Sequence, residues 1–358
     1  MGIGATTTGS GSKMYETIHR QPADLGRLMG EGWAQARQAV DLIGTSERIV
    51  LTGIGTSYHA ALVGAWLIGA AGIDARAVSS FDFARYPEHV PLGVDDAVIV
   101  LAHTGVKRFS AEAMAAAARA GATIVSVGSK AAVHEGSLLT LRTTEREQSA
   151  AYTSSHLCAM AVLAQVATEL GERREAPGIA GFREALEALP DLVAGLLARE
   201  AEVAPIAGYA VEHRTYVAGA GPNEATALED VIKVREAAYG QIDGLAAEQF
   251  LHGPMVAFNA GDLLAMVNVP GRATDRTASI AAVGAAMGGR LWIVGEAIDL
   301  ASATTFALPP TPELISPLLA VVPMQLLACQ MAGLKGINPD TFRRDDERYK
   351  EAFGLVKL

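Results

Sequence analysis

Short apolar runs and longer helical stretches alternate along the first half of the chain. The runs at 48–52, 97–102 and 123–127 are rich in Val, Ile and Leu and are bounded by turn residues, which is typical of strands buried on both faces. The remaining elements expected in this half are helices at about 14–42, 57–72, 110–120 and 153–170 and a short strand at 138–141. This alternation predicts a parallel sheet covered by helices on both faces.

The same alternation restarts in the second half. Strands are expected at 216–218, 263–269 and 291–294, and helices at 223–239, 275–287 and 315–332. A polar stretch at 171–176 and two helical segments up to about 210 connect the halves. The predicted fold class is therefore α/β, with two doubly wound parallel-sheet domains of flavodoxin-like layers in tandem.

These patterns set the expected domain boundaries of the 358-residue chain, whose length fits two domains. The expected parts are a disordered tail at 1–13, a helical segment at 14–46, the first domain at 47–172, a helical connector at 173–212, the second domain at 213–335 and a C-terminal tail at 336–358.

Composition narrows the classes of partner. The net charge of −10 and the absence of a Lys/Arg cluster argue against nucleic-acid binding. The N-terminal residues do not resemble a signal peptide, and the longest apolar runs, at 60–72 and 315–332, suit buried helices better than membrane spans. Cys158 and Cys329 lie in apolar helical stretches, as buried thiols do. We expect a soluble, cytoplasmic protein with no membrane or nucleic-acid partner.

The candidate chemistry is concentrated between residues 229 and 254. Glu229, Lys233 and Glu236 are spaced at i, i+4 and i+7, so a helix places them on one face. His252 follows, directly before a Gly-Pro pair that ends a helix. A carboxylate, an ammonium and an imidazole are the groups needed to move protons around a carbonyl. The alternative is an exposed helix with salt bridges and an ordinary turn.

Each half also contains a Gly-rich turn between its first strand and the next helix, at 52–61 and 218–229. Such turns let the backbone approach a ligand and offer helix N–H groups to an anion. Neither turn is a complete dinucleotide fingerprint, and the chain has no Walker A sequence. No clustered ligand set for a metal is visible, so we expect neither a cofactor nor a metal.

The loops of the first half favour a phosphate. Thr56 and Ser57 begin the helix after the first turn, and the 102–110 segment adds His103, Thr104, Gly105 and Lys107 after the next strand. Hydroxyl and backbone amide groups there predict a phosphate site without a metal, although Lys107 also fits a solvated loop and His103 also fits a structural role. A third segment, at 147–155, is a candidate second wall of the same pocket or only a helix cap; its binding candidates are Ala150, Tyr152 and Thr153.

Taken together, these motifs resemble the isomerase half of the glutamine–fructose-6-phosphate aminotransferase family, which is built from two sugar isomerase (SIS) domains. The similarity runs from Met14 to about Arg343. The segments that carry it are MYETIHRQP at 14–22, GTS at 55–57, TALEDVIKVRE at 226–236, AAEQFLHGP at 246–254 and VVPMQLLACQMAGLKGINPD at 321–340.

The resemblance implies a role for each matching residue. Ser57 and Thr104 match phosphate-binding positions. Glu236 matches the glutamate that shuttles a proton between C1 and C2, with Lys233 and Glu229 as its polar partners. His252 matches the histidine assigned to ring opening, which the family supplies from the neighbouring subunit of a homodimer.

The sequence also departs from the family pattern. AHTGVK stands where the family has SQSGET, so Ala102 and Lys107 replace two hydroxyl residues, and the lysine charge is a substitute for their hydrogen bonds. In the family's VASTK loop, Tyr152 replaces a serine and Ser154 replaces the lysine. Glu347 stands in place of the tail lysine that forms a Schiff base with the ketose.

The resemblance implies a phosphosugar isomerase or deaminase acting on a phosphorylated amino sugar. Glucosamine 6-phosphate, converted to fructose 6-phosphate and ammonia, is the expected substrate. We do not expect a complete amidotransferase, because the sequence shows no glutaminase domain. Two alternatives are a fructosamine-6-phosphate deglycase and a non-catalytic sugar-phosphate sensor.

Overall fold

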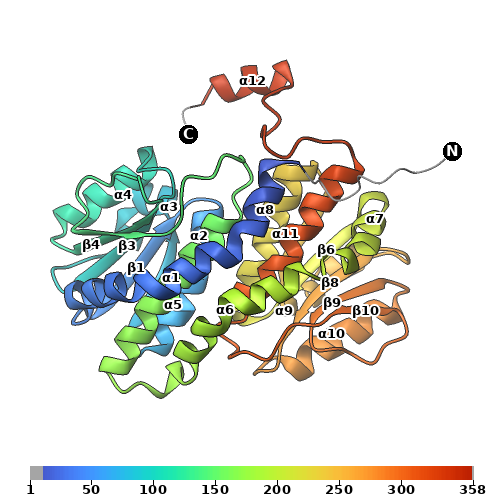
Figure 1. The fold of residues 1–358 in the computed structure, drawn as a ribbon, viewed down its shortest axis with the longest axis horizontal. Coiled ribbons are helices and arrows are strands. Elements are labelled where there is room, and N and C mark those ends of the chain that lie inside the picture. Colours follow the sequence, from blue (N-terminus) through green and yellow to red (C-terminus); the bar gives the residue numbers. More distant parts are fainter. Residues whose placement is uncertain (1–10, 357–358) are drawn as a thin grey trace. The chain divides into compact units, whose positions relative to one another are not determined.

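The computed structural model describes residues 11–356, and these form two parallel five-stranded sheets flanked by helices (Figure 1). The contacts divide the chain into two compact units. One contains residues 21–147 and 154–190; the other contains the residues from 191 onward, the segment before Gln21 and the short segment 148–153. The α/β class with two doubly wound domains in tandem is confirmed.

The first sheet has the strand order β2-β1-β3-β4-β5. Its strands are β1 (Arg48–Gly53), β2 (Asp74–Ser79), β3 (Asp96–Leu101), β4 (Thr123–Gly128) and β5 (Leu139–Arg142). The helices of this half are α1 (Lys13–Ile43), α2 (Thr56–Ala70), α3 (Ser80–Arg85), α4 (Arg108–Arg119), α5 (Ser154–Arg173) and the 3₁₀ turn Pro87–His89.

Burial explains the apolar runs of this sheet. Every residue of β3 is buried, because α2 covers one face while α4 covers the other (Figure 1). Helix α2 packs against α5, and α3 packs against α4. Chain order reverses between β1 and β3, since β2 pairs on the other side of β1. A ligand crevice is expected at such a reversal, at the carboxyl ends of the two strands.

The second sheet has the order β10-β9-β8-β6-β7, with its reversal between β6 and β8. Its strands are β6 (Thr215–Gly219), β7 (Ile242–Ala246), β8 (Leu263–Asn268), β9 (Arg290–Gly295) and β10 (Ala303–Phe306). The remaining helices of the chain are α6 (Phe182–Leu197), α7 (Ala204–Glu212), α8 (Glu224–Ala238), α9 (Ala247–Leu251), α10 (Thr274–Ala286), α11 (Pro317–Leu334) and α12 (Glu347–Gly354), and the remaining 3₁₀ turns lie at Pro177–Ile179, Glu200–Glu202, Gly221–Asn223 and Pro254–Ala257.

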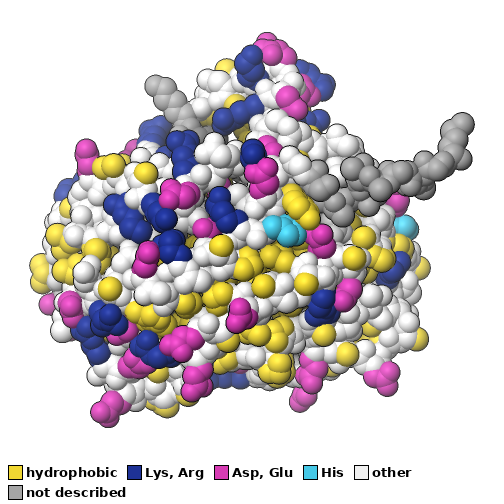
Figure 2. All heavy atoms as spheres, in the orientation of Figure 1, with side chains coloured by type: hydrophobic (Ala, Val, Ile, Leu, Met, Phe, Trp, Pro, Cys, Tyr) yellow, Lys and Arg dark blue, Asp and Glu magenta, His cyan; other side chains and the backbone are white. Residues whose placement is uncertain are grey.

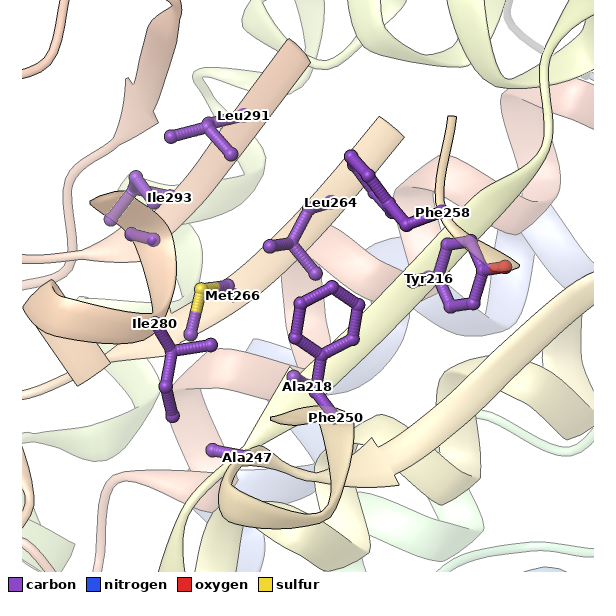
Figure 3. Packing of buried hydrophobic residues seen from close by; sticks show 11 residues of the cluster. Tyr216, Ala218, Ala247, Phe250, Phe258, Leu264, Met266, Ile280, Leu291 and Ile293 are labelled. Atoms are coloured by element: carbon purple, nitrogen blue, oxygen red, sulfur yellow. The ribbon is translucent and has the colours of Figure 1, made fainter. Parts of the chain in front are cut away.

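Helices α8 and α11 pack together on one face of this sheet, whereas α9 and α10 cover the other. On the α9/α10 face, the rings of Tyr216, Phe250 and Phe258 pack against Leu264 and Ile280 (Figure 3). The ring centroids of Phe250 and Phe258 are 5.7 Å apart in an edge-to-face arrangement, which adds to the burial of apolar area.

The structure adds elements that the hydrophobic pattern did not predict: β2, α3, β7, β10 and α12. Strands β2 and β10 lie at sheet edges, and neither has a continuous apolar run. Strand β7 contains a glycine and only one fully buried residue. Residues 191–212, expected in the connector, belong by contacts to the second unit. Of the expected tail at 1–13, residues 1–10 lie outside the described residues, and α1 begins at Lys13.

Among residues 11–356, one helix, α11, is long and apolar enough to cross a membrane by length and composition. Of its span, 89% is buried inside the protein, and a core helix has this pattern.

Candidate active site

Helix α8 brings three of the predicted charged residues together. Glu229 and Glu236 lie one turn before and one turn after Lys233, so both carboxylates approach its ammonium. Lys233 Nζ lies 2.5 Å from Glu236 Oε2 and 3.6 Å from Glu229 Oε1. The predicted charged face of this helix is present in the structure.

Burial distinguishes this cluster from a surface salt bridge. The side chains of Glu229 and Lys233 are 0% and 1% exposed, whereas Glu236 is 21% exposed. A buried ammonium needs close carboxylates to offset its lost hydration. Lys233 therefore places a positive charge beside Glu236, and Glu236 is the member of the cluster that reaches solvent. An exposed helix with ordinary salt bridges, the alternative above, does not match these buried side chains.

Asp230, next to Glu229, was not predicted from the sequence. It is fully buried, and neither of its carboxylate oxygens has a hydrogen-bond partner among the described residues. Burial, and secondarily the nearby charge of Glu229, raises the pKa of Asp230 well above its usual range. Helix α8 thus holds two buried acidic side chains at consecutive positions, and burial favours the protonated form of Asp230. In the sequence, the one sign that Asp230 is buried is its helical spacing, because residue 230 falls on the α8 face that also carries the apolar residues Val234 and Ala237.

A cavity of about 310 Å³ adjoins Glu236. Its walls come from the end of α8, the turn after it, and the C-terminal tail with α12. The lining residues are Arg235, Glu236, Tyr239, Gly240, Gln241, Phe342, Arg343, Tyr349 and Phe353. The aromatic side chains of the tail were not recognised from the sequence, because nothing in the local pattern indicates that the tail folds back onto α8.

His252 is exposed and does not line this cavity. It follows α9, and its Nε2 lies 3.1 Å from Glu248 Oε1. Arg276 contacts the same carboxylate at 2.6 Å. The hydrogen bonds from Arg276 and then from His252 lower the pKa of Glu248 to about 2. Within this unit, His252 and Glu236 therefore occupy different surroundings.

The first-half turn forms a helix N-terminus at the chain reversal of its sheet. Gly55, with a φ of 58°, precedes α2, in which Thr56 and Ser57 are the first residues. A Cβ on Gly53 would lie 2.6 Å from the carbonyl carbon of Ser57, so the turn needs glycine there. The Ser57 N–H donates to Ile54 O at 3.3 Å. The Ser57 side chain is half-buried.

The 102–107 loop follows β3, the neighbour of β1. The carbonyl of His103 accepts the Ser129 N–H at 2.9 Å, and Ala102 O lies 2.9 Å from His134 Nε2. Burial lowers the pKa of His134 and so favours its neutral form. Thr104 and Gly105, with a φ of 115°, are half-buried at the tip of the loop. Lys107 is exposed directly before α4.

Glu147 ties this loop to α5 and was missed as a functional residue. Its N–H donates to His103 Nε2 at 3.3 Å, and its buried Oε1 accepts the Ser155 N–H at 2.5 Å in the first turn of α5. A carboxylate is stabilised at a helix N-terminus by the unpaired N–H groups and the helix dipole. The contact gives His103 a structural role, as an acceptor that fixes the loop.

The 148–153 segment belongs by contacts to the second unit. Thr153 is fully buried, and its hydroxyl oxygen lies 3.0 Å from that of Thr17. Its carbonyl accepts a hydrogen bond from Gln325 at 3.3 Å. Ala150 and Tyr152 are half-buried. The contacts of Thr153 are those of a packing residue.

The turn between β6 and α8 lacks the hydroxyl residues that begin the helix after the corresponding turn of the first half. Glu224 is the first residue of α8, and Glu313 Oε1 accepts the Arg272 N–H at 3.1 Å in the loop after β8. Carboxylates at these positions disfavour a second anion. Among residues 11–356, no group of three or more His, Cys, Asp or Glu side chains is arranged to hold a metal ion.

The comparison with known proteins agrees with this fold. Residues 42–169 match the model of the SIS domain. Glutamine–fructose-6-phosphate aminotransferase of Pyrococcus horikoshii is 30% identical over 337 residues, a match that covers 91% of this chain and 56% of the relative. The chain thus spans about half the length of such relatives.

Several solved structures share the fold. The C-terminal domain of glucosamine-fructose-6-phosphate aminotransferase from Francisella tularensis has a TM-score of 0.85 at 19% identity, covering 94% of this chain and 100% of that domain. Glucosamine-6-phosphate deaminase from Thermotoga maritima has a TM-score of 0.70 at 18% identity, covering 92% of this chain and 97% of that one. The chain contains a SIS domain and is homologous, over 91% of its length, to the isomerase half of the glutamine–fructose-6-phosphate aminotransferases.

Proposed function

We propose that this protein is a sugar-phosphate isomerase of the SIS family that acts on a phosphorylated amino sugar. Its substrate would be glucosamine 6-phosphate and its products fructose 6-phosphate and ammonia. The single observation that carries the proposal is the buried Glu229–Lys233–Glu236 cluster, in which Glu236 alone is partly exposed. Homology to the aminotransferases, and the fold shared with a deaminase, support the choice of substrate.

In the proposed mechanism, Glu236 takes the proton from C2 of the open-chain amino sugar and returns it to C1. The enolamine formed between these steps becomes an imine at C2, to which water adds before ammonia leaves. Lys233 keeps Glu236 ionised for the first step, since it lies 2.5 Å from that carboxylate. Glu229 balances the Lys233 charge inside the helix pair.

The phosphate would bind at the Thr56–Ser57 helix start and the Thr104–Lys107 loop. Parallel strands place these loops at the carboxyl ends of β1 and β3, next to one another in the sheet. Hydroxyls, amide groups and an exposed lysine suit a phosphate dianion. His252 would open the sugar ring from the neighbouring subunit of a homodimer, as the family resemblance implies.

Glu236→Gln tests the proton transfer. The amide cannot accept a proton, so we expect turnover of glucosamine 6-phosphate to fall about 10²-fold or more while its affinity stays near that of the native protein. Steady-state kinetics and calorimetry measure the two quantities. Glu224→Gln, an exposed position on the same helix, is the control. Native turnover in the Glu236→Gln protein would refute the mechanism.

A further inference from the structure

An arginine, a carboxylate and an imidazole form a cluster outside the cavity beside Glu236. Glu248 lies at the start of α9 and His252 directly after it, one helical turn apart, and Arg276 lies in the first turn of α10. The two helices pack against each other. They follow β7 and β8, the strands on either side of β6. The cluster therefore lies at the carboxyl end of the second sheet, the end at which open α/β sheets bind ligands.

Arg276 fixes both oxygen atoms of the Glu248 carboxylate. Its Nε donates to Oε2 at 2.6 Å, and its Nη2 donates to Oε1 at 2.7 Å. Such a two-point contact sets the plane of the carboxylate as well as its position. His252 Nε2 lies 3.1 Å from the same Oε1. Because Arg276, and then His252, lower the pKa of Glu248 to about 2, the carboxylate stays ionised at neutral pH.

The stability of the fold does not account for this arrangement. The side chains of Glu248, Arg276 and His252 are 48%, 54% and 64% exposed. Exposed ion pairs contribute little to stability. On the face drawn in Figure 2, Lys and Arg side chains lie next to Asp and Glu side chains at several places. The cluster differs from such simple pairs in its third member, an imidazole that is held by a fixed carboxylate and remains accessible.

The contact with Glu248 decides which nitrogen of the His252 ring is available. A carboxylate only accepts hydrogen bonds, so Nε2 carries the proton and Nδ1 keeps its lone pair in the neutral ring. Among the described residues, Glu248 is the one hydrogen-bond partner of this ring. Gly253 has a φ of 127°, which favours glycine, and Pro254 follows it. The turn therefore restricts the backbone that carries the imidazole.

We infer that Arg276 and Glu248 are positioning residues that present Nδ1 of His252 to the anomeric hydroxyl of a cyclic sugar phosphate. The inference rests on the proposed function, in which His252 opens the sugar ring. It adds the atom that takes the proton and the two side chains that hold this atom in place.

Ring opening then uses one proton and one imidazole. Nδ1 takes the proton of the hydroxyl group on C1. The bond between C1 and the ring oxygen breaks, its electron pair stays on the ring oxygen, and C1 becomes a carbonyl carbon. The imidazolium returns the proton to the former ring oxygen, which becomes the hydroxyl group on C5. Glu248 stabilises the imidazolium between the two transfers, because the ionised carboxylate is hydrogen-bonded to the opposite side of the ring.

Exchange between the α and β anomers of glucosamine 6-phosphate measures ring opening separately from turnover. The Glu236→Gln protein lacks the proposed base for the next step, so it consumes this sugar only slowly. Exchange spectroscopy of the sugar labelled with ¹³C at C1 gives the rate of interconversion, and the rate without protein is the baseline. We expect the Glu236→Gln protein to exceed this baseline, because it retains His252 and both positioning residues.

Further substitutions in the Glu236→Gln background locate the effect. His252→Ala should return exchange to the baseline. Glu248→Gln should slow the accelerated exchange about tenfold or more, since a misplaced catalytic group costs as much as ~10²-fold in rate. Arg276→Gln should also slow it, and Arg276→Lys, which keeps the charge, should retain more of the rate. Asp275→Asn, at the exposed neighbouring position, is the control and should leave the rate unchanged.

Affinity distinguishes positioning from a role in binding or folding. Calorimetry should give the same affinity for glucosamine 6-phosphate in the Glu248→Gln and Arg276→Gln proteins as in their parent, because only the orientation of His252 changes. Circular dichroism should show the same folded state, since the exposed pair adds little to stability. A loss of affinity as large as the loss of exchange would contradict positioning.

The outcomes also separate the two proposals. Accelerated exchange that survives both Glu248→Gln and Arg276→Gln would overturn this inference and leave proton transfer by Glu236 intact. Turnover by the native protein, without accelerated exchange in the Glu236→Gln protein, would overturn it as well. Absence of turnover in the native protein and of exchange in the variant would overturn the proposed function and, with it, the role of the cluster.

Discussion

Asp230 shows how much one side chain depends on its surroundings. The residue is chemically the same as the exposed aspartates of the surface, yet its carboxyl is fully buried and has no hydrogen-bond partner among residues 11–356. Water no longer stabilises the charged form, and Glu229 next to it opposes a second negative charge. Asp230 therefore keeps its proton under conditions in which an ordinary aspartate is ionised.

Substituting Asp230 by Asn should change how stability depends on pH. Because the pKa is raised in the folded state, the proton contributes stability below the unfolded value of 3.8, and this contribution is lost as pH rises through the folded pKa. Between the unfolded and the folded pKa, the free energy of unfolding of the native protein should fall by up to about 1.4 kcal/mol per pH unit from this group alone. Asp230→Asn cannot ionise and should lack that fall.

Urea unfolding at several values between about pH 5 and 9 measures the difference. The control is Asp275→Asn, because Asp275 is exposed in the first turn of α10. If the native and Asp230→Asn proteins lose stability in parallel with rising pH, Asp230 is ionised in the folded state.

At the scale of elements, the helix start at Thr56 differs from the one at Glu224. Both helices follow the first strand of a sheet through a Gly-rich turn. Helix α2 begins with two hydroxyl residues, whereas α8 begins with a carboxylate. The same strand–turn–helix arrangement therefore favours anion binding at the start of α2 and disfavours it at the start of α8.

The proposed phosphate site predicts a large difference between glucosamine and glucosamine 6-phosphate. Several charge-assisted hydrogen bonds to a phosphate should raise affinity about 10²-fold or more. Lys107→Ala should weaken binding of the phosphorylated sugar more than binding of the unphosphorylated one, and added salt should narrow the gap between the two. Calorimetry measures all four affinities.

Lys130→Ala is a suitable control, since Lys130 is an exposed lysine of the same unit and pairs with Glu145 at 3.1 Å. Equal affinities of the native protein for the two sugars would mean that the turns at 55–57 and 102–107 have only a structural role.

At the scale of the whole molecule, the two halves carry different parts of the proposed chemistry. The hydroxyl loops belong to the unit built on the first sheet, whereas Glu236, its charged partners and His252 belong to the unit built on the second. His252 does not line the cavity next to Glu236. In the proposed function, His252 serves the site of a second subunit.

Mixed dimers test that proposal. Ser57→Asp places a negative charge at the phosphate site, and His252→Ala removes the imidazole, so each variant alone should be inactive. If His252 acts across the interface, a heterodimer of the two contains one site with both native residues and should regain part of the native turnover. If His252 acts within its own chain, both sites of the heterodimer carry a defect. Purified heterodimers without activity would contradict the composite site.

The sequence by itself determined the features that depend on neighbours along the chain. Apolar runs separated by helical stretches specify buried parallel strands, so β1, β3, β4, β8 and β9 were predicted within one or two residues. The spacing of Glu229, Lys233 and Glu236 sufficed to place them on one helix face, because helical geometry is fixed by the backbone. Edge strands such as β2 and β10 were missed, since half-exposed strands need no continuous apolar run.

Only the tertiary structure decided which of these groups are buried and what they contact. The burial of Lys233 and Asp230 depends on the packing of α8 against α11 and the sheet. Glu147 reaches both His103 and the start of α5 through a fold that brings together residues 44 positions apart. The cavity next to Glu236 exists because the C-terminal tail folds back onto α8. Charge and burial depend on distances across the fold, and local sequence does not encode those distances.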